Sequence, residues 1–157
     1  MALIVIPAPL SEPQATLPVV AIKADRHDLA RRRWRAVAED GQEFGFDLTK
    51  PVRHGQTVYA TPTQRYVIQQ HPEPTLVVAL QLAPATAVGL GWAFGNLHLE
   101  ASSEPSCMVV PDTTAARQLL ARLEISFTEE VRVFRPGHFA RVQQPPHELG
   151  PSHQHAG

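Results

Sequence analysis

Alternation of apolar and polar side chains predicts a β-hairpin in the first half of the chain. Two period-2 runs, residues 34–39 and 43–48, each place apolar side chains at alternate positions, on one face. These side chains are Trp34, Ala36 and Ala38 in the first run and Phe44, Phe46 and Leu48 in the second. The Asp40-Gly41 dipeptide between the runs is typical of a tight hairpin turn.

Shorter runs extend the same pattern. Residues 57–60 and 65–70 read as strands on either side of Thr61-Pro62-Thr63. Closely spaced prolines disfavour regular structure over residues 7–18. We therefore expect residues 1–73 to form an N-terminal all-β module.

From residue 74 onward, strand and helix patterns alternate. The apolar runs 75–82, 97–101, 107–110 and 125–134 predict strands. Residues 85–94 predict a helix that Gly95-Asn96 ends, and residues 114–123 predict a second helix capped by Asp112 or Thr113. The order β-α-β-β-α-β is the ferredoxin-like arrangement. The expected fold is mixed α+β, with a ferredoxin-like domain over residues 74–136.

The segment 137–157 loses periodicity and is rich in Pro, Gly, Gln, Ser and His. This composition cannot bury enough apolar surface to offset the entropy of ordering, so a flexible tail is expected. Imidazole is a common ligand for Zn, Cu and Ni, and short His-rich tracts are typical of metal binding. The candidate ligands here are His147, His153 and His155.

Charge and cysteine content exclude several classes of protein. The formal net charge is −1 and only 18% of residues are charged, which argues against nucleic-acid or membrane-surface binding. The basic run Arg31–Arg35 leads into a predicted strand and is interpreted as a solvated strand entrance. Cys107 is the single cysteine, so no intrachain disulfide or cysteine zinc cage can form. Its role is not assigned.

No targeting pattern is apparent. The apolar start, residues 1–9, is short, lacks a basic flank and is broken by prolines, unlike a secretory signal. No apolar run approaches the ~18 residues that span a bilayer. A cytoplasmic location is the expectation.

His98 follows the first predicted helix of the second module, in the segment Gly91-Trp92-Ala93-Phe94-Gly95-Asn96-Leu97-His98. This segment resembles the G-N-x-H signature of the UreE family, urease accessory proteins that carry nickel. Other features match that family in order: Arg33-Trp34-Arg35, the Asp40-Gly41 turn, Pro72-Glu73-Pro74, the βαββαβ pattern and the His-bearing tail.

The resemblance implies a nickel metallochaperone that performs no reaction. It implies a homodimer in which His98 and its symmetry mate ligate Ni(II) at the two-fold axis, while tail histidines, His153 and His155 first and then His147, supply further ligands. It further implies that the β module binds a partner or peptide. The implied partners are the urease accessory GTPase and the urease apoprotein complex.

This chain departs from the family pattern at two places. The signature commonly has a basic residue and a nearby proline, where this chain has Leu97 and then Leu99-Glu100. Some members carry two extra metal-binding histidines where this chain has Val109-Val110-Pro111-Asp112, so an accessory site is not expected here.

The residues themselves leave other functions open. An N/O ligand set suits Ni(II), Cu(II) or Zn(II) without selecting nickel, because intrinsic affinity favours copper. A non-metal scaffold that binds accessory proteins through its β module is one alternative, and a small metal-dependent hydrolase is another. A Cys107–His98 nucleophile pair across adjacent strands lacks an orienting group, and no H-E-x-x-H motif is present.

Overall fold

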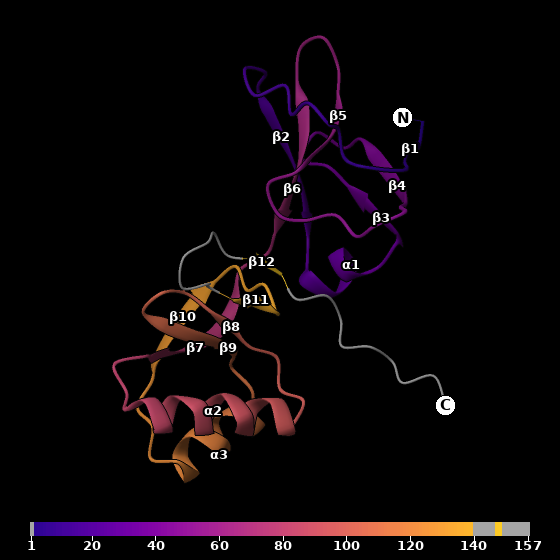
Figure 1. Cartoon of the computed structure of the whole chain (residues 1–157). Helices are drawn as coiled ribbons and strands as arrows, with labels where there is room; N and C mark the ends of the chain where they lie inside the picture. Colours follow the sequence, from indigo (N-terminus) through magenta and orange to yellow (C-terminus); the bar gives the residue numbers. More distant parts are fainter. Residues whose placement is uncertain (1, 140–146, 149–157) are drawn as a thin grey trace. The chain divides into compact units, whose positions relative to one another are not determined.

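The predicted hairpin is present in the computed structural model, which describes residues 2–139 and 147–148 (Figure 1). Strands β3 (Arg33–Val37) and β4 (Glu43–Asp47) pair antiparallel, with Trp34 opposite Phe46. The rings of these two residues stack with centroids 3.9 Å apart. The period-2 alternation therefore holds, and it places one face of the hairpin in the core.

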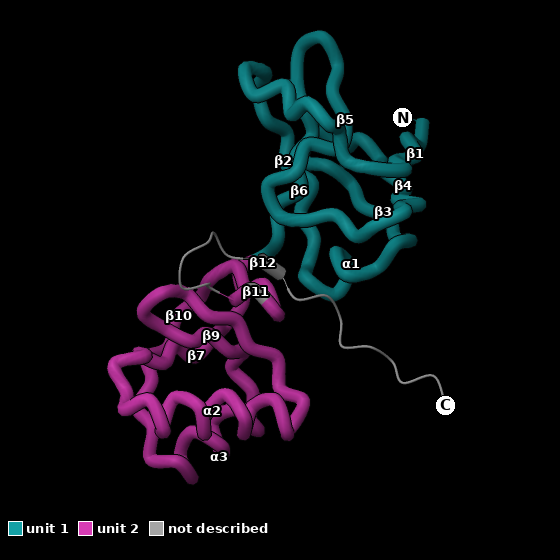
Figure 2. The backbone as a smooth tube through the Cα atoms, viewed as in Figure 1, with its two compact units in different colours: residues 1–71 teal, residues 72–157 magenta. Residues whose placement is uncertain are grey.

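The chain divides into two units, Met1–His71 and Pro72–Gly157 (Figure 2). The first unit contains two three-stranded sheets, ordered β1-β4-β3 and β2-β6-β5, and one short helix. Its remaining elements are β1 (Ile4–Ile6), β2 (Val19–Ala24), α1 (Arg26–Ala30), β5 (Thr57–Ala60) and β6 (Arg65–Gln70). The core between the sheets includes the fully buried Ile22, Phe44 and Ile68.

The hairpin turn is tied to this core by Asp40. Its carboxylate accepts hydrogen bonds from the Tyr66 hydroxyl at 2.7 Å and from the Gln64 amide at 2.9 Å. It also accepts from the Gln42 backbone N–H at 3.1 Å. These donors, the Tyr66 hydroxyl first, hold the pKa of Asp40 below its usual value. The turn thus depends on an ionised carboxylate.

We expect Tyr66→Phe to lower the free energy of unfolding by about 1 kcal/mol at pH 7, because the bond to a charged acceptor is lost. The folded-state pKa of Asp40 is lowered, so its stabilisation is present above the unfolded-state pKa of about 3.9 and is lost as pH falls through the folded-state pKa. The gap between variant and parent in urea-unfolding midpoints should therefore narrow from pH 7 to pH 3. If the difference between the two midpoints stays constant with pH, the lost stability comes from packing of the Tyr66 side chain and not from its hydrogen bond to the Asp40 carboxylate.

The second unit is built on a six-stranded sheet ordered β10-β7-β9-β8-β11-β12. Strand β9 lies between β7 and β8 and is antiparallel to both. The two helices lie together on one face of this sheet (Figure 1). The elements are β7 (Glu73–Ala79), α2 (Pro84–Asn96), β8 (Ser102–Ser103), β9 (Cys107–Pro111), α3 (Thr114–Arg122), β10 (Thr128–Arg132), β11 (His138–Phe139) and β12 (His147–Glu148).

The helices bury a few large side chains each. Leu90 and Phe94, four residues apart on α2, are 1% exposed, and Leu119 and Leu120 of α3 are buried beside them. Pro84 opens α2 at its first turn, and the Thr113 hydroxyl caps α3 by accepting from the Ala116 N–H at 3.1 Å. The fold is mixed α/β, as the sequence pattern indicates.

Four sequence-based expectations need correction. Residues 97–101 form no strand, because His98 adopts a positive φ of 53° that interrupts extended backbone. Ser102–Ser103, expected in a turn, is strand β8. The short elements β1, β2 and α1 were not predicted. The segment 137–157 was expected to be a flexible tail, but part of it forms strands. Strand β11 pairs with β8 through Phe139 and Ser103, and β12 pairs with β11.

No helix in the described part of the chain combines the length and apolarity needed to cross a membrane.

Candidate metal site

His98 sits at the C-terminus of α2 in a hydrogen-bonded helix end. Its N–H donates to Gly95 O at 3.0 Å, and the Leu99 N–H donates to Phe94 O at 3.0 Å. With Leu97 as the C-cap, this is the bond pattern of a Schellman motif. His98 occupies its left-handed position, which is most often glycine.

A histidine at this position is conformationally unfavourable. Left-handed backbone costs an L-residue roughly 1–2 kcal/mol, although histidine tolerates it better than β-branched residues do. The imidazole is exposed, and the structure gives it no hydrogen-bond partner among the described residues. The side chain therefore adds nothing visible to the fold of a single copy, which favours a role in binding.

The outer face of α2, next to His98, is apolar and uncovered within one copy. Val88 is 72% exposed and Trp92 is 69% exposed, and Leu97 at the helix end is also exposed. The helix has no charged residue. A Cβ added at Gly89, Gly91 or Gly95 would meet no atom within 4 Å. An exposed apolar helix of this kind is typical of an interaction surface.

A small cleft opens beside His98. Its volume is about 360 Å³, and it is lined by Leu99, Glu100, Pro111, Thr113 and Ala116 as well as His98. Within residues 2–139, no three His, Cys, Asp or Glu side chains are grouped so that they could hold a metal ion. A site at His98 is consequently incomplete in one copy of the described chain.

The structure places the tail histidines only in part. The backbone of His147 lies in β12 and pairs with Phe139 of β11. His153 and His155 lie outside the described residues. Gly137, which precedes all three histidines in the chain, lies close to Ala101, because the Gly137 N–H donates to Ala101 O at 2.9 Å.

Cys107 is not part of a metal or nucleophile pair in the described structure. Its thiol donates to a Glu104 carboxylate oxygen at 3.6 Å. Burial, followed by the neighbouring Glu104 carboxylate, raises the pKa of Cys107. Glu104 is itself paired with Arg132. The thiol is therefore protonated at neutral pH and is a poor ligand and nucleophile.

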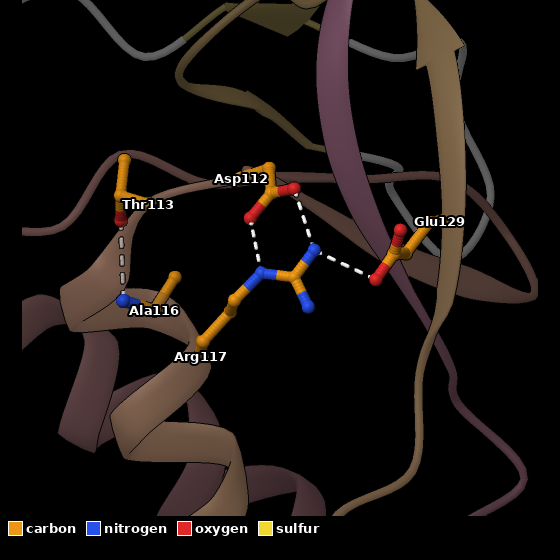
Figure 3. A network of polar contacts seen from close by, with 5 residues as sticks. All are labelled: Asp112, Thr113, Ala116, Arg117 and Glu129. Carbon is orange, nitrogen blue, oxygen red and sulfur yellow. Dashed lines mark hydrogen bonds and ion pairs between the residues drawn. The ribbon is translucent and has the colours of Figure 1, made fainter.

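The carboxylate at the entrance to α3 is also engaged. The Arg117 guanidinium donates hydrogen bonds to both carboxylate oxygens of Asp112, at 2.6 and 2.7 Å, and to one carboxylate oxygen of Glu129 at 2.7 Å (Figure 3). The hydrogen bonds from Arg117 lower the pKa of Asp112, and both acidic partners raise the pKa of Arg117. The Arg117 guanidinium thus lies between the Asp112 and Glu129 carboxylates.

Sequence reasoning found His98 but missed the surface around it. Residues 85–94 were expected to form a helix, yet their exposed apolar side chains Val88 and Trp92 were not singled out. The signal was present: Pro84–Asn96 has no charge with which to face water. The Arg117 network was missed because its partners are separated in sequence.

A family model and individual known proteins both relate this chain to the UreE urease accessory proteins. The model of the protein family described as "UreE urease accessory protein, C-terminal domain" matches residues 73–156. The "Urease accessory protein UreE" of Staphylococcus aureus strain MRSA252 is 28% identical over 130 residues, covering 80% of this chain and 84% of that protein. The proteins of the same name from strains Newman and JH1 match to the same extent.

Proposed function

The chain belongs to the UreE family of urease accessory proteins, and from that premise we propose that it is a nickel metallochaperone. It binds Ni(II) where two copies meet and passes the ion to the urease maturation machinery. As a member of a family of accessory proteins, it is not an enzyme. The observation that carries the proposal is an exposed imidazole, His98, fixed at the end of an uncovered apolar helix.

The dimer explains how one histidine becomes a metal site. A two-fold axis brings the same surface of both copies together, so one His98 per chain supplies two nitrogens at one point. The outer face of α2 supplies the apolar area for that contact through Val88, Trp92 and Leu97. The absence of side chains at its glycines lets two backbones approach closely, which offsets their helix-weakening effect of about 1 kcal/mol each.

Further ligands come from the tail in this proposal. Two imidazoles leave coordination positions open, and His147, His153 and His155 all follow Gly137, whose N–H is bonded to Ala101 O. Ligands on a tethered segment can complete the coordination of the metal ion and can also dissociate from it. This suits a protein that must pass its metal ion to another protein. The N/O set suits Ni(II), with Zn(II) and Cu(II) as competitors in vitro.

The parts of the chain divide the work accordingly. Residues 74–136 form the ferredoxin-like metal-binding and dimerisation domain; the element order and the position of β9 between β7 and β8 support this arrangement. Residues 1–73 form the partner-binding β domain, and residues 137–157 form the tail. The partners are the urease accessory GTPase and the urease apoprotein complex, in the cytoplasm.

Calorimetric titration with Ni(II) and with Zn(II) tests this function on the full chain. A tight Ni(II) site with one ion per two chains supports a metallochaperone. A dimer that binds neither ion tightly yet still captures the urease accessory GTPase would instead support the scaffold.

The tail contribution is tested by removing imidazoles while keeping the backbone. We expect the triple variant His147→Gln, His153→Gln, His155→Gln to bind Ni(II) roughly tenfold or more weakly without losing the site, since a tethered ligand adds to a site that the domain defines. The matched control replaces His27 and His71, exposed histidines of the first unit, with Gln. Identical isotherms for the two variants would remove the tail from the mechanism.

A further inference from the structure

The outer face of the sheet β1-β4-β3 carries an open slot in the first unit. Its floor is Gly45 of β4, which lies between Val5 of β1 and Arg35 of β3 in the strand register. The slot has a volume of about 470 Å³. Leu3, Val5, Arg33, Arg35 and Asp47 line it together with Gly45.

Gly45 is buried, and the side chain of Leu3 lies over it. A Cβ built there would lie 3.5 Å from a methyl of Leu3, in ordinary contact. Leu3 is 39% exposed and Val5 is 61% exposed, so one wall of the slot is apolar and open to solvent. A space of this size and lining accepts one or two side chains of a ligand.

The opposite wall and one end of the slot are positively charged. Arg33 pairs with Asp47 at 2.8 Å, and Arg31 pairs with Asp28 at 3.2 Å. The exposed Arg32, Arg35 and Lys50 have no carboxylate partner among the described residues. Lys50 lies near Arg32, because the Leu48 N–H donates to Arg32 O at 2.8 Å. This end of the sheet therefore carries more cations than carboxylates.

We propose that this slot docks an acidic segment of a partner protein, with one apolar side chain against Leu3 and Val5 and carboxylates on Arg35 and on the basic end formed by Arg32 and Lys50. The inference deepens the proposed partner-binding role of residues 1–73. It also gives the Arg31–Arg35 run a function beyond that of a solvated strand entrance.

The spacing of the face sets the pattern of the ligand. Successive outward residues on a strand lie about 6.7 Å apart, which is the separation of Arg35 and Arg33 along β3. An extended ligand has the same period. An apolar ligand residue against Val5, level with Gly45, therefore places its second following residue at the Arg33–Asp47 pair and its fourth at the basic end. The matching segment has an apolar residue followed by several acidic residues. Arginine beside apolar surface is a frequent centre of such contacts.

The probe is the peptide Ser-Leu-Ser-Asp-Asp-Glu, acetylated and amidated, added to the ¹⁵N-labelled full chain. We expect amide shifts confined to β1, β4 and β3, centred on Gly45, with a dissociation constant on the order of 100 µM. Two matched peptides separate the contributions. One replaces Leu with Ser, and the other replaces Asp and Glu with Asn and Gln. Each should bind at least about fivefold more weakly.

Two variants test the slot itself. Arg35→Glu should weaken binding about tenfold, since an attraction becomes a repulsion. Val5→Ser removes the apolar wall at a largely exposed position and should weaken binding about threefold. Lys23→Glu is the charge control: it reverses one positive charge in the first unit, on β2, where Lys23 pairs with Glu39 at 2.7 Å. It should bind the peptide as the parent does. Circular dichroism verifies that each variant is folded.

Three results would overturn the proposal: no shifts around Gly45 at 1 mM peptide, equal affinity for the neutral peptide, or equal losses in Arg35→Glu and Lys23→Glu. Tighter binding of a 12-nucleotide single-stranded DNA at the same amides would assign the face to a polyanion instead. Ni(II) isotherms of Arg35→Glu are recorded in parallel. A normal nickel site with no peptide binding refutes the slot alone, whereas a parent chain without a nickel site refutes the metallochaperone.

Discussion

His98→Gly is expected to lose the tight Ni(II) site while leaving the fold as stable as before, or more stable by up to about 1 kcal/mol. The imidazole is exposed and makes no hydrogen bond among the described residues, so its removal leaves no cavity. Glycine relieves the left-handed backbone at φ 53°. The greater freedom of glycine in the unfolded chain offsets part of that gain.

The same unit contains a matched control. Glu124 ends α3 in the same geometry, with φ 54° and with the Ile125 N–H donating to Leu120 O at 3.0 Å. Glu124→Gly should change stability as His98→Gly does and leave Ni(II) affinity unchanged. Urea unfolding of the metal-free chains and nickel calorimetry give the two readouts.

The contrast also distinguishes a ligand from a structural residue. His98→Ala keeps the left-handed strain, so it should be less stable than His98→Gly and equally unable to bind nickel tightly. Full-affinity nickel binding by either His98 variant would contradict the proposed site. A large loss of stability in His98→Gly would show that the imidazole supports the fold.

The local parts of the fold could be predicted from the sequence because their signals are local. The Asp40-Gly41 hairpin combines period-2 alternation with a turn dipeptide, and the structure confirms its register. The Thr113 cap and an apolar stripe predict helix α3 from the sequence. The predicted bounds agree with Thr114–Arg122 to within one residue.

The strand expected at residues 97–101 shows where local reasoning fails. Leu97, Leu99 and Ala101 alternate as in a strand, but Leu99 follows a left-handed residue and serves as the apolar end of a helix cap. A glycine at position 98 would have signalled that cap. Histidine hides it, because histidine is not the residue typical of this position in a helix cap.

Long-range features could not be predicted because they depend on the assembled sheet. Strand β11 forms by pairing with the free edge of β8, which is only two residues long and was itself expected to be a turn. Likewise, the basic run was identified in the sequence, yet only the register of β3 against β4 shows that Arg35 lies opposite Gly45. The candidate ligand His98 was identified from a sequence motif, whereas the apolar surface beside it was identified from the exposed side chains of α2 in the structure.

On the proposal that two copies meet through α2, the variant Trp92→Glu is expected to dissociate the dimer and to abolish the tight nickel site. Trp92 is 69% exposed in one copy, so a charge there costs little in folding. At a two-fold contact the same change places two carboxylates in an apolar interface close to one another. Like-charge contact and desolvation together cost several kcal/mol, so dimerisation should weaken at least about a hundredfold.

Val131→Glu is the matched control, because Val131 is 70% exposed and lies in the same unit, on β10 instead of α2. Sedimentation velocity should find Trp92→Glu monomeric and both the parent and Val131→Glu dimeric at micromolar concentration. Because a monomer offers one His98, Trp92→Glu should bind nickel only weakly although its histidines are intact. A dimeric Trp92→Glu would place the contact elsewhere on the chain. A monomer that keeps the tight site would show that one copy supplies all the ligands, in which case some of them must come from residues outside the described part of the chain.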